Sequence, residues 1–519
     1  MPVGSVLVTG GTGYIGSFTA LALLEADYKV VIADNLYNSS QEAIRRIELI
    51  CGKRPEFYNV DVTEPGSLDQ IFEAHPDIDS VIHFAALKAV GESSEIPLEY
   101  YRTNVYGTIC LLTSMTKYNV SNIVFSSSAT VYGDATRFPN MIPIPEECPI
   151  GPTNPYGRTK STIEACITDH VEAQRNNLKK QGKDGDHWNA ALLRYFNPAG
   201  SHPSGVMGED PQGVPYNLLP LLAQVAIGKK DKLLVFGDGR TAVSHSHGGP
   251  YATRFLTELT ADYSSKDGTA IRDYIHILDL AQGHLVALNY LRDHHPGVRA
   301  WNLGTGKGST VFHMIKAFSH AVGKELPYQV VGRRAGDVLD LTANPMRANM
   351  ELGWKAQRSL EDACEDLWRW TRNNPQGYRQ NPPQELLDKL QAGKGADPKK
   401  AMPEPVPETN GHSATESTTK SAKKDMAGTA ENASIGTEKS KPVLATNGKA
   451  IPPDALNEAG ADPSTAVAQN DHSAVANGGS VSANGSILIA AERDMASSTG
   501  NASMTAGESL PVPVGGQTT

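Results

Sequence analysis

Tyr156 and Lys160 have the residue types and the spacing of a catalytic acid–base pair. Residues four apart lie on one face of a helix, so a helix here would place the phenol beside the ammonium group. The reference pKa of tyrosine is about 10, and a nearby positive charge favours its phenolate form. The pair could therefore take the proton of an alcohol near neutral pH. On its own, such a spacing usually marks only a partly exposed helix surface.

A serine triplet, Ser126 to Ser128, supplies a third group. It ends an apolar run that is typical of a strand in a parallel sheet. Ligands bind at the carboxyl ends of such strands, where the helix that carries Tyr156 could also begin. Ser128 would hydrogen-bond the reacting hydroxyl, while Lys160 and a positively charged hydride acceptor favour the phenolate. Together the three side chains predict oxidation of an alcohol by hydride transfer.

A glycine-rich turn near the start of the chain could hold the dinucleotide. Gly10, Gly13 and Gly16 follow a short apolar run and open an amphipathic stretch. The first glycine permits a tight turn, the second lets a pyrophosphate approach the backbone, and the third allows close packing of helix on strand. The N–H groups at the start of the helix would then face the phosphates. A three-glycine pattern alone is weak, but both flanking elements that it needs are predicted here.

Asp34 ends the next strand-like run, Lys29 to Asp34. A carboxylate at this point can accept hydrogen bonds from the ribose hydroxyls of the adenosine, and it would repel a 2′-phosphate. NAD is therefore favoured over NADP. Asp61 and Val62 follow a third apolar run and could hold the adenine, although Asp61 by itself is an ordinary turn residue.

Strand-like and helix-length segments alternate through the first 196 residues. Further apolar runs at Ser80 to Phe84, Asn122 to Ser126 and Ala190 to Tyr195 are typical of buried parallel strands. They predict an α/β fold with a doubly wound parallel sheet of Rossmann type. We expect an NAD-binding domain at residues 1–196 and a smaller substrate-binding portion at 197–380, with some crossing of the chain between them.

The remaining residues, 381–519, are predicted to form a disordered low-complexity tail. No Phe, Tyr or Trp occurs from Arg379 to Thr519, so this stretch has too little apolar surface to offset the entropy of ordering. Its one apolar run, Ile487 to Ala491, is too short to span a bilayer. We therefore expect no membrane anchor.

Charge and cysteine usage exclude several classes of protein. The net charge is −10 and no Lys/Arg block stands out, which argues against nucleic-acid binding. The five cysteines are scattered without metal-like spacing, so we expect free thiols, no metal site and a reducing compartment, the cytoplasm. The first residues resemble a strand and not a secretion signal.

A joint set of motifs resembles the UDP-glucose 4-epimerase family of the extended short-chain dehydrogenase/reductase superfamily, from residue 4 to about residue 380. The motifs are GGTGYIG (10–16), ADNLYNSS (33–40), HFAALKAVGES (83–93), SSSATVYGD (126–134), NPYGRTK (154–160), RYFNPAG (194–200) and RDYIHILDLA (272–281). The resemblance implies that Tyr156 takes the proton of the sugar 4-hydroxyl while hydride passes to tightly held NAD. The keto sugar turns over and takes both back, which interconverts UDP-glucose and UDP-galactose in galactose metabolism.

The resemblance also implies binding residues at matching positions. Besides the three glycines, those for NAD are Tyr14, Ile15, Asp34, Asn35, Leu36, Tyr37, Asn38, Ser39, Asp61, Val62, Phe84, Ala85, Ala86, Leu87, Lys88, Asn104 and Phe196. Besides Ser128 and Tyr156, those for the UDP-sugar are Asn197, Asn217, Leu218, Arg272, Arg334 and Asp337. Arginines suit a diphosphate and an aspartate can accept ribose hydroxyls.

Two positions depart from the family pattern. Thr103 replaces an Asn that faces the cofactor in some members, and Leu341 stands where bacterial members carry a Tyr that narrows the sugar pocket. The second departure leaves open an N-acetylated substrate, although leucine is still bulky. The family is commonly homodimeric through helices around 104–118 and 156–174, so we expect a homodimer.

Rival functions remain within and outside this superfamily. Nucleotide-sugar dehydratases and decarboxylases need an acid just after the catalytic serine, but Ala129 and Thr130 follow Ser128 and the next acid is Asp134. This favours simple epimerisation. A non-catalytic NAD-binding regulator typically loses the Tyr or the Lys, and both are present.

Two segments do not fit the family pattern. Gly239 to Ala261, with His245 and His247, matches nothing in it and could be a lid, a tolerated insertion or a translated intron; two histidines alone give weak support for a metal. The segment after residue 380 is too short and too poor in aromatics to be the mutarotase domain that some fungal relatives carry, so we expect no mutarotase activity.

Overall fold

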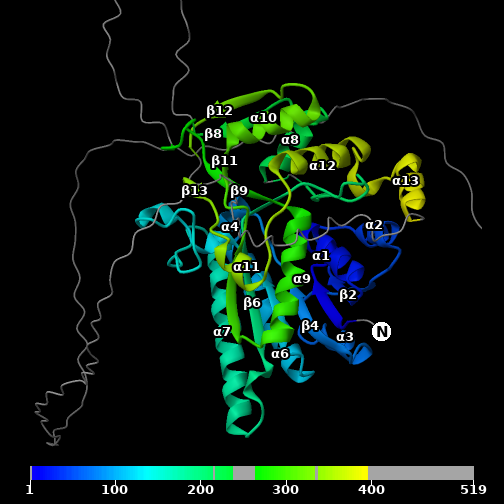
Figure 1. The fold of residues 1–519 in the computed structure, drawn as a ribbon, viewed down its shortest axis with the longest axis vertical. Coiled ribbons are helices and arrows are strands. Elements are labelled where there is room, and N and C mark those ends of the chain that lie inside the picture. The colour runs from blue at the N-terminus through cyan, green and yellow to red at the C-terminus, as the bar shows by residue number, and fades with distance from the viewer. Residues whose placement is uncertain (1–2, 214, 216, 238–262, 334–336, 395–519) are drawn as a thin grey trace, which may run out of the picture. The chain divides into compact units, whose positions relative to one another are not determined.

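A parallel sheet of seven strands lies at the centre of the part of the chain that the computed structural model describes, residues 3–213, 215, 217–237, 263–333 and 337–394. The strands are ordered β10-β6-β5-β4-β1-β2-β3 and every neighbouring pair is parallel. Their bounds are β1 (Ser5–Thr9), β2 (Lys29–Asp34), β3 (Glu56–Asn59), β4 (Ile78–His83), β5 (Asn122–Ser126), β6 (Asn189–Tyr195) and β10 (Val298–Leu303). The predicted doubly wound α/β fold is confirmed (Figure 1).

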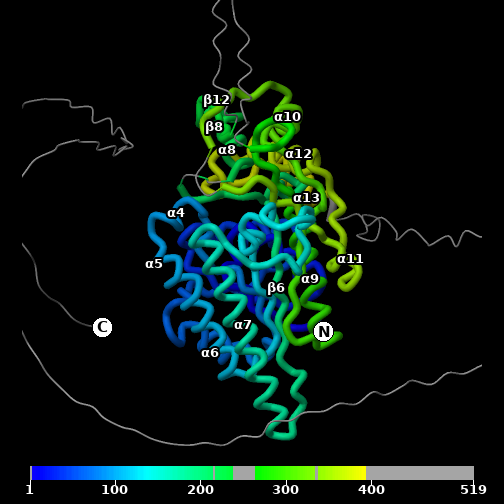
Figure 2. Tube along the Cα trace, turned by 90° about the vertical axis from the view of Figure 1, so that its left-hand side faces the viewer, coloured from blue at the N-terminus to red at the C-terminus, as the bar shows by residue number. Residues whose placement is uncertain are grey.

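Helices cover both faces of this sheet. Successive side chains of a strand point to opposite faces, and accordingly Val6 and Val8 of β1 belong to one core cluster and Leu7 to another. The first cluster packs α1 (Tyr14–Glu25), α2 (Glu42–Cys51) and α9 (Ile277–His294) on the sheet. The second packs α3 (Asp69–Ala74), α6 (Gly107–Lys117) and α7 (Pro155–Lys180) on the other face. Figure 2 shows α6 and α7 side by side.

A π-helix interrupts the helical segment before α6. The short helices α4 (Val90–Glu95) and α5 (Pro97–Tyr100) lead into π-helical residues Tyr101–Tyr106, which continue directly into α6. A π-helical turn is wider than an α-helical one and frequently occurs at functional sites. Here it carries Asn104, whose side chain is fully buried.

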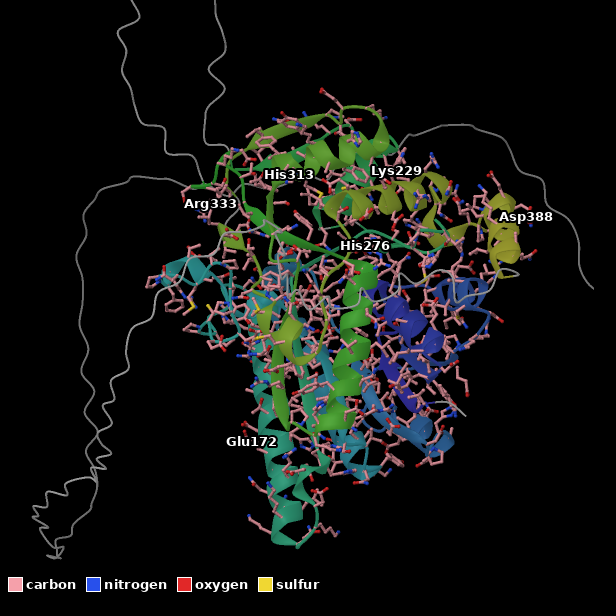
Figure 3. All side chains as sticks on the ribbon, viewed as in Figure 1. Glu172, Lys229, His276, His313, Arg333 and Asp388 are labelled. Carbon is pink, nitrogen blue, oxygen red and sulfur yellow. The ribbon has the colours of Figure 1, made fainter. Side chains whose placement is uncertain are left out.

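The C-terminal portion has a small mixed sheet and a third core cluster. Strand β9 (Ile271–His276) pairs with β7 (Asn197–Ala199), β11 (Gly308–Thr310) and β13 (Asp340–Leu341). Above it, Figure 2 shows the pair of β8 (Leu233–Phe236) and β12 (Tyr328–Val331) with α8 (Leu218–Ala226), α10 (Val311–Val322) and α12 (Leu360–Asn373). His276 links this portion to the rest: it caps α9 by accepting from Leu278 N at 3.1 Å and faces Asp366 of α12 at 3.3 Å (Figure 3).

The chain crosses between the two predicted portions and extends past the predicted end. Helix α9 and strand β10 return to the seven-stranded sheet, so residues after 197 build its outer edge, where α11 (Met346–Glu351) also packs. Helix α13 (Gln384–Lys394) lies within the segment predicted to be disordered, so that prediction is wrong for these residues. Its three leucines, two glutamines and one glutamate are strong helix formers, so the helix needs no aromatic residue to form. Residues 395–519 of the tail and residues 239–261 lie outside the described residues.

Candidate active site

The helix α7 begins at the residues that the sequence singled out. Asn154 precedes it, and its side chain accepts a hydrogen bond from Gly157 N at 2.8 Å, while Pro155 takes the first helical position. Both choices are typical of helix starts, because the first N–H groups have no partner within the helix. Tyr156 therefore lies in the first turn and Lys160 in the second. Both are buried, with exposures of 8% and 2%.

Lys160 reaches across to the end of β5. Its Nζ donates to the Ser126 carbonyl oxygen at 2.7 Å and lies 4.9 Å from the Phe125 ring centre and 5.8 Å from that of Tyr156. Burial lowers the pKa of Lys160 to about 7, and the Glu164 carboxylate opposes that fall. Burial and the Glu164 charge thus act on the pKa of Lys160 in opposite directions.

Ser128 is joined to Tyr156 by a hydrogen bond between their side chains. Its Oγ also accepts from Thr130 N at 3.2 Å and Thr130 Oγ1 at 3.0 Å, which fixes its position at the start of a short turn. The structure therefore brings the three predicted catalytic side chains together.

The pKa of Tyr156 differs from the expectation. Burial raises it to about 12, and only the hydrogen bond with Ser128 opposes the rise. Among the protein's own groups, removal from water outweighs the expected effect of Lys160, because burial disfavours a phenolate. A phenolate near neutral pH thus requires further positive charge beside the ring.

The glycine turn leaves room only for glycine. Gly10 has a φ of +68°, and a Cβ on it would lie 2.6 Å from Ala85 N. A Cβ on Gly16 would collide with the Gly10 carbonyl oxygen. No side chain caps α1 at Gly13, so the first N–H groups of this helix are open toward a phosphate, as a dinucleotide requires. The residues present fit the predicted cofactor.

Asp34 ties the glycine turn to the loop after β2. Its Oδ2 accepts from Thr12 N at 3.1 Å, and its Oδ1 accepts from Leu36 N at 2.9 Å and Ser39 Oγ at 3.0 Å. Leu36 has a φ of +59°, a conformation that non-glycine residues seldom adopt, so this loop is held by its contacts. Beside it, Asn35 Nδ2 donates to Asp61 Oδ2 at 3.0 Å. Hydrogen bonds thus join the segments that are predicted to bind the adenosine.

Asn104 clamps two predicted parts of the site. Its Oδ1 accepts from Leu87 N at 2.8 Å, and its Nδ2 donates to Leu87 O at 3.0 Å and to Thr159 Oγ1 at 3.1 Å. These bonds use both amide donors, so Asn104 joins the loop after β4 to the catalytic helix. Its predicted contact with NAD stays a prediction.

A pocket lies over the glycine turn. The C-terminal portion supplies part of its wall, and Lys88 Nζ lies 3.2 Å from Glu209 Oε1 across it. It is lined by Thr12, Gly13, Tyr14, Ser17, Asn38, Ser39, Ser40, Lys88, Gly208, Glu209, Asp210, Pro211 and Tyr378. Tyr14 OH donates to Gly200 O at 2.7 Å, which ties α1 to the segment after β7.

The predicted UDP-sugar residues gather around β9. Arg272 on this strand donates through Nη2 to Asp337 Oδ1 at 2.5 Å, and Tyr263 OH donates to Asp337 Oδ2 at 2.9 Å. Asn197 is on the neighbouring strand β7, directly opposite Tyr274. Asn217 precedes α8 without capping it, and Leu218 is its first residue. Arg334 lies outside the described residues.

Phe196 and Leu341 share a buried cluster near the serine turn. Phe196 is 3% exposed and Leu341 8%, and Ala129 packs in the same cluster.

Across the described residues there is no group of His, Cys, Asp or Glu that could hold a metal, and none of the helices there is long and apolar enough to cross a membrane.

Comparison with known proteins fits this geometry. The NAD dependent epimerase/dehydratase family matches residues 6–304. A UDP-glucose 4-epimerase of Schizosaccharomyces pombe is 54% identical over 375 residues, which are 72% of this chain and 96% of that protein. The chain belongs to the UDP-glucose 4-epimerase family. The bifunctional protein GAL10 of Pachysolen tannophilus is 57% identical over 378 residues, but this chain spans only about half of its length, 50%.

Solved structures of UDP-glucose 4-epimerases share the fold. One from Bifidobacterium longum, in complex with NAD+ and UDP, has a TM-score of 0.63 at 42% identity and covers 72% of this chain and 99% of that one. Another from Stenotrophomonas maltophila, with bound NAD and formylated UDP-arabinopyranose, has a TM-score of 0.61 at 41% identity and covers 71% and 98%.

Sequence reasoning missed three residues at this epimerase-family site. Glu164 and Ser127 join α7 to the serine turn, and Tyr263 holds Asp337. Glu164 had a signal, because it continues the spacing of four from Tyr156 through Lys160. Tyr263 had none, since its contact with Asp337 joins residues 74 apart in the chain.

Proposed function

We propose that this chain interconverts UDP-glucose and UDP-galactose by reversible epimerisation at C4 with tightly held NAD, in galactose metabolism. The observation that carries the proposal is the convergence of Tyr156, Ser128 and Lys160 at the end of β5. The names of the similar epimerases support the substrate, and the complexes with NAD support the cofactor.

In this proposal Tyr156 takes the proton of the sugar 4-hydroxyl and later returns it. Ser128, already bonded to Tyr156, holds the hydroxyl and shares its proton. Lys160 Nζ lies 5.8 Å from the centre of the Tyr156 ring, and its protonated form would favour the phenolate. Bound NAD would supply the hydride acceptor and, with its positive ring, the charge that the buried phenol needs.

The absence of an acid beside the serine supports epimerisation over dehydration. The Thr130 hydroxyl donates a hydrogen bond to Ser128 Oγ at 3.0 Å. Asp134 accepts from Thr136 N at 3.1 Å as a cap of the next turn, so its carboxylate is engaged away from Ser128. A leaving hydroxyl of the sugar would find no proton donor at this position.

We further propose that the residues predicted for the two ligands bind them. Tyr14 and Ile15 at the open end of α1, Asp34 to Ser39, and Phe84 to Lys88 would hold NAD. Arg272 and Arg334 would contact the diphosphate and Asp337 the uridine ribose, with Asn197, Asn217 and Leu218 around the sugar. Arg272 and Asp337 would then exchange their mutual bond for bonds to UDP.

Three further proposals concern the domains, the cellular compartment and the oligomeric state. Residues 1–196 and 197–380 would act as cofactor and substrate portions. The five free thiols support a reducing compartment, the cytoplasm. A homodimer is supported by exposed apolar side chains on α5, the π-helix and α6, where Leu98 is 82%, Tyr106 43% and Ile109 44% exposed.

The decisive experiment is turnover of UDP-galactose without added NAD. We expect activity in the wild type and a loss of about 100-fold or more in Tyr156→Phe, because general base catalysis contributes on that scale. Tyr118→Phe, which removes an exposed hydroxyl bonded to Glu73, is the matched control and should keep full activity. Equal rates for the wild type and Tyr156→Phe would refute the mechanism.

A further inference from the structure

The Glu164 carboxylate joins three elements behind the catalytic residues. It projects from α7 one turn beyond Lys160 and its side chain is 8% exposed. Its Oε1 accepts from Ser127 Oγ at 2.5 Å and from Arg194 Nε at 2.9 Å, while its Oε2 accepts from Arg194 Nη2 at 2.7 Å. It therefore connects α7 to the serine turn after β5 and to β6.

The three serines of the turn have different partners. The Ser126 carbonyl oxygen receives Lys160, and its hydroxyl meets Tyr195 OH. The Ser127 hydroxyl donates to Glu164, and the Ser128 hydroxyl is bonded to Tyr156. The middle serine is thus the link between the groups that face the reaction and the buried ion pair behind them.

Further hydrogen bonds hold the ion pair of Arg194 and Glu164 in place. Arg194 Nη1 also donates to Tyr132 OH at 3.1 Å and Glu146 O at 3.2 Å, so the guanidinium is held from several sides. A buried ion pair is expensive to desolvate and is often no better for stability than an apolar pair, so its presence here needs another explanation. Fixing the geometry of the neighbouring turn is such an explanation.

We propose that Glu164, braced by Arg194, is a positioning residue that holds Ser127 and thereby sets Ser128 against Tyr156 on the face of α7. The inference rests on the proposed epimerase function. The hydrogen bonds of the Glu164 carboxylate go to Ser127 and Arg194, so it acts through Ser127 and through its charge on Lys160. Without the Ser127 bond, the turn could shift by fractions of an ångström, which is enough to lose catalytic alignment.

The charge of Glu164 has a separate effect on Lys160. Lys160 is faced by Glu164 and Tyr156 on α7, by His83 on β4 and by the Ser126 carbonyl on β5. Only Glu164 is negatively charged in this set, and it raises the pKa of Lys160 against the effect of burial. Removing that charge would lower the pKa, so Lys160 would lose its proton at lower pH.

The test compares Ser127→Ala with Ser161→Ala in the NAD-containing protein. Ser161 follows Lys160 and bonds only the Arg158 carbonyl, so its variant loses the same kind of group away from the serine turn. We expect kcat to fall about tenfold or more in Ser127→Ala, with KM for UDP-galactose, bound NAD and Tm close to the wild type, and no change in Ser161→Ala. Glu164→Gln should lose kcat and also move the alkaline limb of its pH profile to lower pH.

The outcomes separate the two proposals. An active wild type with an equally active Ser127→Ala would overturn the inference alone, as would a fall in kcat matched by loss of NAD or of folded protein. An alkaline limb unchanged in Glu164→Gln would overturn the effect on Lys160. A wild type that converts no UDP-galactose would overturn the proposed function and this inference with it.

Discussion

Two arginine–carboxylate pairs in this molecule differ in what surrounds them. Arg194 and Glu164 lie behind the catalytic turn with side chains 10% and 8% exposed, and further hydrogen bonds hold both partners. Arg272 and Asp337 lie at the predicted substrate side, with exposures of 12% and 28%. Both partners of the first pair are buried (the closed pair), whereas the Asp337 carboxylate of the second is partly exposed (the open pair). Similar contacts thus differ in how far the carboxylate is removed from solvent.

Breaking the closed pair should lower the free energy of unfolding more than the other substitutions. Arg194→Met leaves Glu164 buried without its cation, and loss of one partner of a buried pair typically costs about 3–5 kcal/mol. We expect the free energy of unfolding to fall by about that amount in urea denaturation. Arg299→Met is the matched control: its pair with Glu351 is more exposed, at 41% for the arginine, so about 1 kcal/mol or less is expected. A similar loss in both variants would contradict the contrast.

Breaking the open pair should affect both binding and stability. Arg272→Met leaves Asp337 bonded to Tyr263 and partly exposed, but it also removes the donors to the Ile271 and Val338 carbonyl oxygens. The free energy of unfolding should therefore fall by about 1–3 kcal/mol, less than in Arg194→Met. A hydrogen bond to a charged group contributes about 1.5–3 kcal/mol, so KM for UDP-galactose should rise about 10- to 100-fold. Steady-state kinetics and denaturation of the same preparation check both parts. A KM that stays unchanged would show that Arg272 does not bind the diphosphate.

The buried ammonium beside the closed pair should make stability depend on pH. Burial lowers the pKa of Lys160 to about 7, whereas an unfolded lysine has a pKa of about 10.4. Between these values the unfolded chain binds a proton that the folded chain lacks, so the free energy of unfolding rises with pH. Lys160→Met removes this dependence of the free energy of unfolding on pH.

We therefore expect the stability of Lys160→Met relative to wild type to decrease by about 2 kcal/mol from pH 7 to pH 9, because the wild type gains over that range. Urea denaturation of both proteins at the two pH values measures it. A constant difference would mean that Lys160 keeps an ordinary pKa in the folded chain.

Local pattern was enough to predict much of the fold. The runs Lys29 to Asp34 and Asn122 to Ser126 are the strands β2 and β5 residue for residue. They were predictable because buried parallel strands are continuous apolar runs between turns. Helix α13 was missed because composition was judged over the whole tail, while a short helix depends on only a few residues.

The site divides in the same way. The glycine turn, the serine triplet and the spacing of Tyr156 and Lys160 could be recognised because each is a local pattern with a known geometric consequence. Burial raises the pKa of Tyr156 to about 12 in the chain without a cofactor, and the sequence could not show this, because that burial depends on what packs around α7.

The predicted catalytic side chains and the elements that carry them follow from local patterns in the sequence. The groups that support these side chains follow from contacts between elements that are distant in the chain. Sheet order places β5 beside β6, so Ser127, Glu164 and Arg194 meet across separations of 30 and 37 residues. Periodicity describes one element at a time, whereas such contacts depend on which elements are neighbours. The same reason explains why the pairing of Arg272 with Asp337 appears only in the folded chain.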